Sequence, residues 1–478
     1  MTDEVEGPCP FGVHATTGRP LEGALTSRDV AQLLAEEDHG RRAIGGPHPV
    51  RVTYSLQFGL DPNELKDAGW GLIFEAGTDP APYLEALTDL VELRRQEAEN
   101  RFRVFSGADG YRPGESASDW LTRHGASLIQ IDPDYGVPYY LVIVGSPCSI
   151  PFAFQYSLDI VAAVGRLDFP SLDGFKAYAR SIAMFEKDTT RMTRRCIELF
   201  ATCHDFDRAT QLFTKNVAKP LSAGDEMRGP LGSRYGFSVS ASLGDRSTKA
   251  NLIRILEENK RAPSIIFTGT HGMAFDATDT RRLDNQGALV CQDWPGYGNI
   301  SSEHWFAAQD VPLDANVHGL IHFFFACYGA GTPEFDNFQF EAPNVRIASS
   351  PMTARLPQKL MTLPQGGVLA SLGHIDRAWA SSFQGRRGAA QTQGFREVID
   401  RLLAGQRIGL ATDNFNNQWG VLSTELADML SDKAYGKALR ESDLLALRIA
   451  RDDCRNYVVL GDPAVKLRPE TLPPPYDL

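Results

Sequence analysis

Residues 263–272 read PSIIFTGTHG, and residues 320–331 read LIHFFFACYGAG. Each segment is a short apolar run that ends at a reactive side chain, His271 in the first and Cys327 in the second. Such runs, bounded by Gly or Pro, are typical of buried strands in a parallel sheet covered on both faces. Ligands of open α/β sheets bind at the carboxyl ends of the strands. We therefore expect His271 and Cys327 at one edge of a parallel sheet, with a crossover helix over residues 301–309.

This pair of side chains suits nucleophilic catalysis. A thiolate is a strong nucleophile, and a neighbouring imidazole either lowers the thiol pKa or accepts its proton. Gly272 follows the histidine and lets the backbone approach a substrate closely. The amides of Gly272 and Cys327 are therefore candidates to bind the oxygen of a tetrahedral intermediate. The glycines after Cys327 are equally typical of a simple turn.

The other histidines and cysteines are better explained by structure. His-Gly also occurs at His39, His124 and His318, but only His271 closes an apolar strand. His39 and His124 end predicted helices, where Gly terminates the helix. His322 lies inside its strand and is expected in the core. Buried cysteines usually act as small hydrophobes, and this reading covers four further residues: Cys148, Cys196, Cys203 and Cys454.

The two strand ends together resemble those of the clan CD cysteine peptidases, which include caspases, gingipains, clostripain and separase. The separation 327 − 271 = 56 residues is similar to the spacing of about 50 in caspases. Residues 139–145 (YYLVIVG), followed by Ile150-Pro151, Asp159 and residues 164–166, resemble the opening of the gingipain catalytic region. Residues 460–464 (LGDPA) resemble its end and that of the related CHAT peptidases. The resemblance covers about residues 137–467.

The resemblance also implies further site residues. Gingipains use an acidic residue upstream to orient the histidine, and Asp159 lies near the corresponding place. In this fold, the strand after the cysteine strand leads into a loop that forms a wall of the S1 pocket, here residues 373–379. A buried Asp376 would favour Arg or Lys at P1, whereas a salt bridge with Arg377 or another arginine is the alternative. Phe325 replaces the glutamine of caspases, so a preference for Asp is not implied.

Three more residues are candidates for substrate binding, each with a structural alternative. Trp379 either packs against a substrate side chain or fills the core. His374 forms either a pocket wall or a cap at the sheet edge. Asp168 is a second acidic candidate for binding a basic P1 side chain.

Composition limits the class of protein. The 478 residues carry a net charge of −12, with 42% hydrophobic and 23% charged residues, as in ordinary globular proteins. The negative charge argues against a nucleic-acid partner, and no run approaches the ~18 apolar residues of a membrane span. The acidic start lacks a secretory signature, and seven scattered cysteines without a CxxC pair favour a reducing compartment. We expect a cytoplasmic protein that requires no cofactor; a structural calcium ion stays an open alternative.

Strands and helices alternate along most of the chain. We expect a three-layer α/β/α sandwich with a mostly parallel caspase-like sheet in residues 138–468. Residues 1–137 are expected to form a smaller N-terminal α/β region with its own sheet and a helix over residues 27–36. Residues 469–478 are Pro-rich and should be extended and exposed.

We interpret the chain as a cysteine endopeptidase with Cys327 as nucleophile and His271 as general base, acting on a polypeptide substrate. A cytoplasmic protease needs restraint, so we expect a latent state released by a regulatory partner or by cleavage, for example within residues 273–298. Two alternatives stay open: a scaffold or sensor without turnover, and a transpeptidase or ligase that uses the same pair. A nucleotide-binding fold is poorly supported, because no GxGxxG follows the strands.

Overall fold

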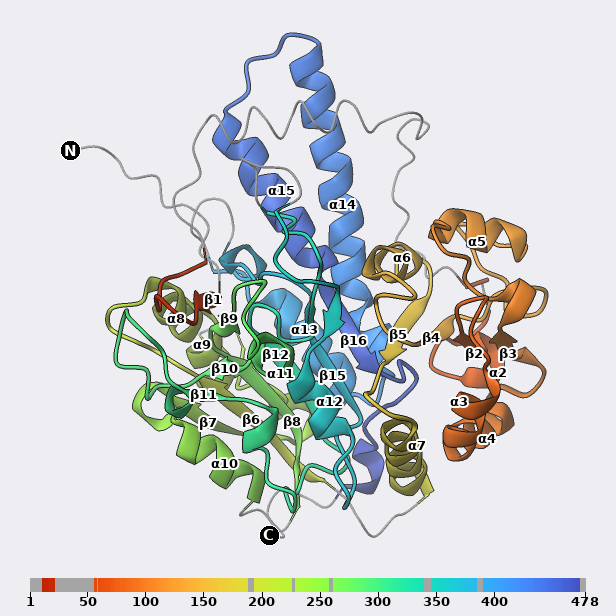
Figure 1. Cartoon of the computed structure of the whole chain (residues 1–478), viewed down its shortest axis with the longest axis horizontal. Coiled ribbons are helices and arrows are strands. Elements are labelled where there is room, and N and C mark those ends of the chain that lie inside the picture. The colour runs from red at the N-terminus through yellow and green to blue at the C-terminus, as the bar shows by residue number, and fades with distance from the viewer. Residues whose placement is uncertain are drawn as a thin grey trace.

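The computed structural model describes residues 11–21, 56–57, 59–187, 193–225, 228–257, 261–338, 345–384 and 390–472. Within these residues the centre is a ten-stranded sheet with the order β3-β2-β4-β5-β16-β15-β12-β8-β6-β7 (Figure 1). Its strands are β2 (Trp70–Ile73), β3 (Phe102–Phe105), β4 (Tyr140–Val144), β5 (Ala163–Leu167), β6 (Arg194–Ala201), β7 (Ser238–Leu243), β8 (Pro263–Gly269), β12 (Ile321–Phe325), β15 (Ala370–His374) and β16 (Tyr457–Gly461).

The sheet consists of two blocks of parallel-paired strands. The pairs between β3, β2, β4, β5 and β16 are all parallel. The pairs between β15, β12, β8, β6 and β7 are parallel as well. Only β15 and β16, which join the blocks, pair antiparallel. The carboxyl ends of β8 and β12 therefore share one edge of the sheet.

Helices cover both faces of the sheet (Figure 1). They are α2 (Leu65–Ala68), α3 (Ala81–Ala86), α4 (Thr88–Ala98), α5 (Ala117–Arg123), α6 (Phe152–Leu158), α7 (Leu172–Lys187), α8 (Arg208–Phe213), α9 (Lys219–Ala223), α10 (Lys249–Glu257), α11 (Arg282–Asn285), α12 (Arg355–Met361), α13 (Gln393–Leu403), α14 (Ile408–Ala434) and α15 (Glu441–Arg455). On one face, Phe395 of α13 packs against Phe323 and Phe325 of β12. This α/β/α sandwich with a mostly parallel sheet confirms the predicted fold class.

The N-terminal region shares the main sheet. Strand β2 pairs in parallel with β4, from Trp70 opposite Tyr140 to Ile73 opposite Ile143. The expected separate smaller sheet is therefore wrong, because β2 and β3 extend the large sheet at one edge. The domain boundary at residue 137 stays a prediction. The helix expected over residues 27–36, together with Cys9 and His39, lies outside the described residues.

A second sheet of four strands lies beside the main one, in the order β1 (Gly12–His14), β9 (Gly272–Ala274), β10 (Leu289–Val290) and β11 (Trp305–Phe306). The crossover helix expected over residues 301–309 is wrong. That segment contains two 3-10 turns around β11, whose Val290–Trp305 and Leu289–Phe306 pairs tie it to β10. Strands β8 and β12 are nevertheless adjacent and parallel, as predicted. Two strands of two residues each, β13 (Gly331–Thr332) and β14 (Met352–Thr353), pair antiparallel after the cysteine strand.

The long helix α14 was not predicted. It contains two glycines and several Asn, Asp and Thr residues, all of low helix propensity, so its sequence carries a weak helical signal. Packing supplies the stability instead, because α14 lies against α15, with Leu426 in a cluster with Leu444 and Leu447. Figure 1 shows α14 and α15 side by side, projecting from the body of the protein.

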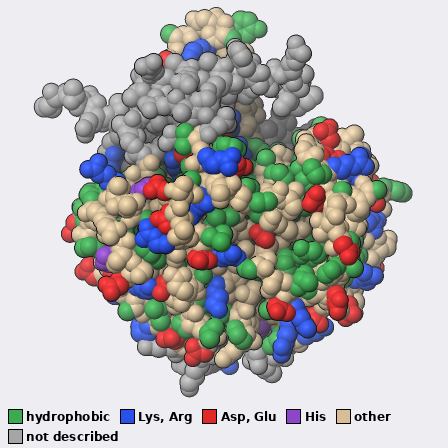
Figure 2. Space-filling model, in the orientation of Figure 1, with side chains coloured by type: hydrophobic (Ala, Val, Ile, Leu, Met, Phe, Trp, Pro, Cys, Tyr) green, Lys and Arg blue, Asp and Glu red, His purple; other side chains and the backbone are tan. Residues whose placement is uncertain are grey.

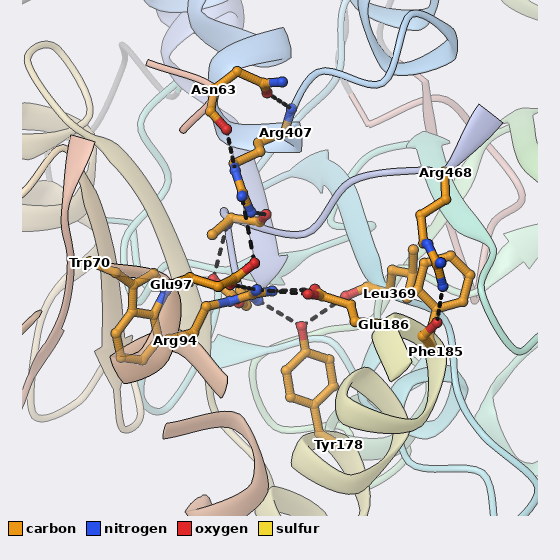
Figure 3. A network of polar contacts seen from close by, with 12 residues as sticks. Asn63, Trp70, Arg94, Glu97, Tyr178, Phe185, Glu186, Leu369, Arg407 and Arg468 are labelled. Carbon is orange, nitrogen blue, oxygen red and sulfur yellow. Dashed lines mark hydrogen bonds and ion pairs between the residues drawn. The ribbon is translucent and has the colours of Figure 1, made fainter. Parts of the chain in front are cut away.

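The LGDPA segment gains a structural role in a buried polar network (Figure 3). The Asp462 carboxylate accepts hydrogen bonds from Trp70 Nε1 at 2.9 Å and from Arg94 Nε at 2.7 Å. The Asp462 amide donates to the Tyr178 hydroxyl at 2.7 Å, and Arg94 also pairs with Glu186. Because these residues come from β2, α4, α7 and the end of β16, the network ties the first block of the sheet to its helices.

The C-terminal segment is not extended at its start. Residues Pro469–Thr471 form a 3-10 turn, and Leu472 is buried. The Arg195 guanidinium donates to the carbonyl oxygens of Pro469 and Leu472, which holds the turn against the body of the protein. The prediction of an extended segment is therefore wrong for Pro469–Thr471, and that of an exposed one is wrong for Leu472, whereas Glu470 is exposed. Residues 473–478 lie outside the described ones.

Candidate active site

His271 and Cys327 lie at equivalent positions on neighbouring strands. In the parallel pairing of β8 with β12, Gly269 is opposite Phe325, and each reactive residue comes two positions later. The amide of Thr270 donates to Phe325 O at 3.2 Å, which continues the ladder toward the site. Both side chains are fully buried. The structure thus brings the two predicted residues to the same edge of the sheet.

His271 is oriented by Asp207. Its Nε2 is 2.9 Å from Asp207 Oδ2, and its Nδ1 has no hydrogen-bond partner among the described residues. Asp207 also caps α8, because its carboxylate accepts the Thr210 amide at 2.8 Å. Burial opposes ionisation of Asp207, but the interaction with His271 and these hydrogen bonds outweigh it, and its pKa is well below the ordinary value. An ionised Asp207 leaves Nδ1 as the imidazole atom available for proton transfer.

Asp159 does not take the orienting role expected from the sequence. Its Oδ1 accepts the Val164 amide at 2.9 Å, next to Asn416 and Asp413 of α14. Burial raises the pKa of Asp159 to about 8. The sequence analysis did not identify Asp207 as a site residue. The available signal was its position six residues after β6, since the carboxyl end of β6 lies beside that of β8.

The thiol of Cys327 is enclosed by backbone groups. Its Sγ accepts the Ala378 amide at 3.3 Å and lies 3.7 Å from Ala378 O. Burial raises the pKa of the Cys327 thiol above its usual range. The next residue, Tyr328, has a φ of 59°, which is strained for a side chain of this size. The six described cysteines are all free.

Two backbone amides converge on one oxygen beside the thiol. The amides of Gly272 and Cys327 both donate to Phe11 O, at 2.8 and 2.9 Å. This is the pair of amides that the sequence suggested for an oxyanion hole. A Cβ on residue 272 would collide with the backbone carbonyl of Cys327, so this close approach requires glycine. Phe11, which carries the bound carbonyl, was not predicted as a site residue.

The predicted acidic pocket residue is held in a polar cluster. Asp376 is buried and accepts hydrogen bonds from Asn337 Nδ2 and the Arg377 amide, both at 2.9 Å. Burial and repulsion from Asp336 raise the pKa of Asp376 to about 7. The Arg377 guanidinium pairs with Asp336 at 2.5 Å, and its charge acts against the rise in the pKa of Asp376. The alternative of a salt bridge to Asp376 itself stays open.

The other three substrate-binding candidates have structural partners. His374 Nε2 is 3.1 Å from Asp453 Oδ1, and both side chains are buried. Trp379 is buried and packs against Phe338, with ring centroids 5.2 Å apart. Asp168 follows β5, and its backbone carbonyl oxygen accepts a hydrogen bond from Gln358 Nε2 at 2.7 Å; its place in the pocket stays a prediction.

The face of the molecule in Figure 2 carries charges of both signs. On the face in Figure 2, acidic and basic side chains are interspersed rather than gathered in a band. No group of three His, Cys, Asp or Glu residues that would hold a metal ion occurs among the described residues. None of the helices in the described parts of the chain is both long and apolar enough to span a bilayer. The expectations about cofactors and calcium stay predictions.

No protein-family model matches this chain, and no curated protein is similar to it in sequence. Similar solved structures include the Arg-specific cysteine proteinase gingipain R (TM-score 0.48, 14% identity, covering 88% of this chain and 80% of that chain). They also include a complex of the Porphyromonas gingivalis RgpB pro- and mature domains (TM-score 0.45, 15% identity, covering 84% of this chain and 80% of that chain). A third is the Saccharomyces cerevisiae separase–securin complex (TM-score 0.34, 9% identity, covering 68% of this chain and 16% of that chain). Gingipain and separase are peptidases that the sequence motifs resemble. At these values the likeness assigns no role to any residue.

Proposed function

We propose that this chain is a cysteine endopeptidase whose nucleophile is Cys327 and whose general base is His271. The observation that carries the proposal is the convergence of the Gly272 and Cys327 amides on a single peptide carbonyl, next to the thiol. Two donors fixed on a backbone oxygen are the arrangement that stabilises a tetrahedral oxyanion. The Asp207–His271 pair supplies an oriented imidazole at the same edge of the sheet.

The reaction follows from these positions. The Cys327 thiol gives its proton to His271 Nδ1, and Sγ bonds to the substrate carbonyl carbon, whose oxygen becomes an oxyanion held by the two amides. The C–N bond then breaks, and His271 gives the proton to the leaving amine. Water, deprotonated by His271, attacks the thioester, and the acid product leaves with the thiol restored. Asp207 acts as a positioning residue throughout, because it acts on the reaction through the imidazole of His271.

The finer parts of the sequence hypothesis differ in their support. A latent state is supported by the burial of Cys327 and by the occupied amide pair. A basic P1 preference has little support, because the Asp376 carboxylate is engaged by Asn337 and the Arg377 amide. The cytoplasmic location and a regulatory protein partner stay predictions, which cell fractionation and co-purification would test.

Two other functions use the same fold. A scaffold or sensor would bind without turnover, and its Cys327 would react with plain alkylating reagents but not with substrate-like probes. A transpeptidase or ligase would pass the acyl group to an added amine, and ligated product would then exceed hydrolysed product. The buried Asp207–His271 pair favours a protein that transfers protons, and therefore favours the two enzymatic readings over the scaffold.

The test uses a library of acyloxymethyl ketones with varied P1 residues, applied to the intact chain and after limited proteolysis. We expect an adduct on Cys327 that His271→Ala abolishes and that Cys148→Ala, which removes an exposed thiol, leaves intact. Asp207→Asn should lower kcat by roughly 10²–10⁴, as loss of the orienting carboxylate does in other triads, with partial rescue by Asp207→Glu. Iodoacetamide alkylation of Cys327 without any ketone adduct would refute the peptidase.

A further inference from the structure

Residue Phe11 uses its backbone as a bound peptide substrate would. Its carbonyl oxygen accepts the amides of Gly272 and Cys327, and its own amide donates to Ala378 O at 2.8 Å. Ala378 belongs to the loop after β15, which the sequence analysis expected to form the S1 wall. The backbone on both sides of the carbonyl is therefore fixed against the candidate catalytic groups. In peptidase terms Phe11 stands where a P1 residue stands, the residue whose carbonyl is attacked.

The side chain of Phe11 fills an aromatic cavity. It is fully buried, and its ring centroid lies 4.7 Å from that of Phe325 and 5.7 Å from those of Phe213 and Phe383. All three contacts are edge-to-face, which is a favourable arrangement for aromatic pairs. The His271 ring closes the cavity at 5.8 Å. A basic side chain here would bury its charge against phenylalanine rings, at a large desolvation cost.

Gly12 places the following peptide group against the thiol. A Cβ built on residue 12 would stand 2.8 Å from Cys327 Sγ and would also collide with Leu21. The sulfur therefore lies beside the bond between Phe11 and Gly12, and only glycine fits there. Beyond this point the chain pairs in parallel with β9, Gly12 opposite Gly272 and His14 opposite Ala274. Residues 11–14, called the strap below, thus cover Cys327.

From these contacts we infer that the cavity lined by Phe213, Phe325 and Phe383 is an S1 subsite for an aromatic P1 side chain. The strap is its built-in occupant, and it keeps the site closed until it is displaced. This inference rests on the proposed function and deepens it, because it names the substrate class and the origin of latency. The substrates are polypeptides with Phe or a similar ring at P1 and a very small residue, ideally Gly, at P1′. Phe325, in the position before Ala326-Cys327, then contributes directly to specificity.

The strap is tested by accessibility of the thiol. Phe11→Ala removes the ring that anchors the strap, and Gly12→Val creates a clash with Cys327 without changing the cavity. Phe11→Ala should raise the rate of Cys327 alkylation by iodoacetamide on the order of 100-fold, as expected from the loss of a buried ring. Gly12→Val should raise the same rate, because the clash displaces the strap from the thiol. The control is Phe105→Ala, which removes a buried ring from the far edge strand β3. Equal alkylation rates in wild type and both strap variants, or an equal rise in the control, would overturn the strap.

The S1 assignment is tested on the opened variants with two acyloxymethyl ketones that differ only at P1. We expect the P1-Phe probe to label Cys327 about tenfold faster than the P1-Arg probe, or more. Faster labelling by P1-Arg would overturn the aromatic subsite and leave the peptidase standing. If iodoacetamide reaches the Cys327 thiol but neither probe nor any other ketone in the library labels it, the proposed peptidase function itself is refuted. A Phe213→Ala variant that loses the preference for P1-Phe would support the assignment independently.

Discussion

Replacing Asp159 with Asn should stabilise this protein at neutral pH and leave the candidate active site intact. Asp159 is buried, and burial raises the pKa of its carboxyl from 3.8 to about 8, with a further contribution from Asp413. The Val164 amide and Asn416 act in the opposite direction but do not compensate. An Asn side chain keeps an oxygen for the Val164 amide and cannot ionise. The substitution therefore removes a cost of folding at neutral pH.

The size of the effect follows from linkage between protonation and folding. A carboxyl whose folded pKa is raised contributes stability that is full below the unfolded pKa and is lost as the pH rises through the folded pKa. At pH 7 the difference 7 − 3.8 = 3.2 pH units corresponds to about 4 kcal/mol, an upper value because the folded protein relaxes around the charge. Asp159→Asn should thus match wild type near pH 4 and exceed it by up to about 4 kcal/mol at pH 7.

The assay is urea unfolding of wild type and Asp159→Asn from pH 4 to pH 9. The difference in unfolding free energy between the two proteins cancels the titration of all other groups. Peptide cleavage is measured on the same samples. Asp314→Asn, the same change at an exposed position, is the matched control. A flat difference between Asp159→Asn and wild type over this pH range, together with lost cleavage activity, would refute this reasoning and return Asp159 to the role of histidine orienter.

Two more substitutions test the site and the fold. Gly272→Ala should reduce kcat by about 10²-fold, because its Cβ collides with the Cys327 carbonyl and displaces the oxyanion amide by roughly 1 Å; unchanged kcat on a P1-Phe peptide would count against that amide. Arg94→Met should lower the free energy of unfolding by about 3–5 kcal/mol, because Asp462 stays buried without its cation. Arg440→Met, which breaks an exposed ion pair, is the control and should change stability by less than about 1 kcal/mol.

The sheet was predictable where its strands are continuous apolar runs. Strands β4, β8 and β12 are such runs, and β8 and β12 pair in parallel as predicted. The sequence could not reveal that β2 continues the main sheet, since pairing partners are a tertiary property. Helix α14 was missed for the opposite reason, because packing against α15 overrides its poor propensity.

Only those site residues that end strands could be predicted from the sequence. His271, Gly272 and Cys327 end strands, and a strand end at a sheet edge is visible in the sequence. Asp207 lies in the connection that follows β6. Its sequence position indicates only that it caps α8, and does not indicate its contact with His271. Phe11 had no local signal at all, because its contacts are with residues more than two hundred positions away, and nothing in its own segment specifies them.

The charged cluster around Asp376 holds together the two loops that contact the strap. Tyr328 and Asp376 both have positive φ values, 59° and 82°, and such strained residues persist only when their surroundings hold them. The Tyr328 amide donates to Asp376 O at 2.7 Å, which fixes the cysteine loop to the loop that carries Ala378. Asp336 and Arg377 brace the same loop by an ion pair. The acidic residue expected to bind substrate thus fixes the distance between Cys327 and the Ala378 backbone that binds Phe11.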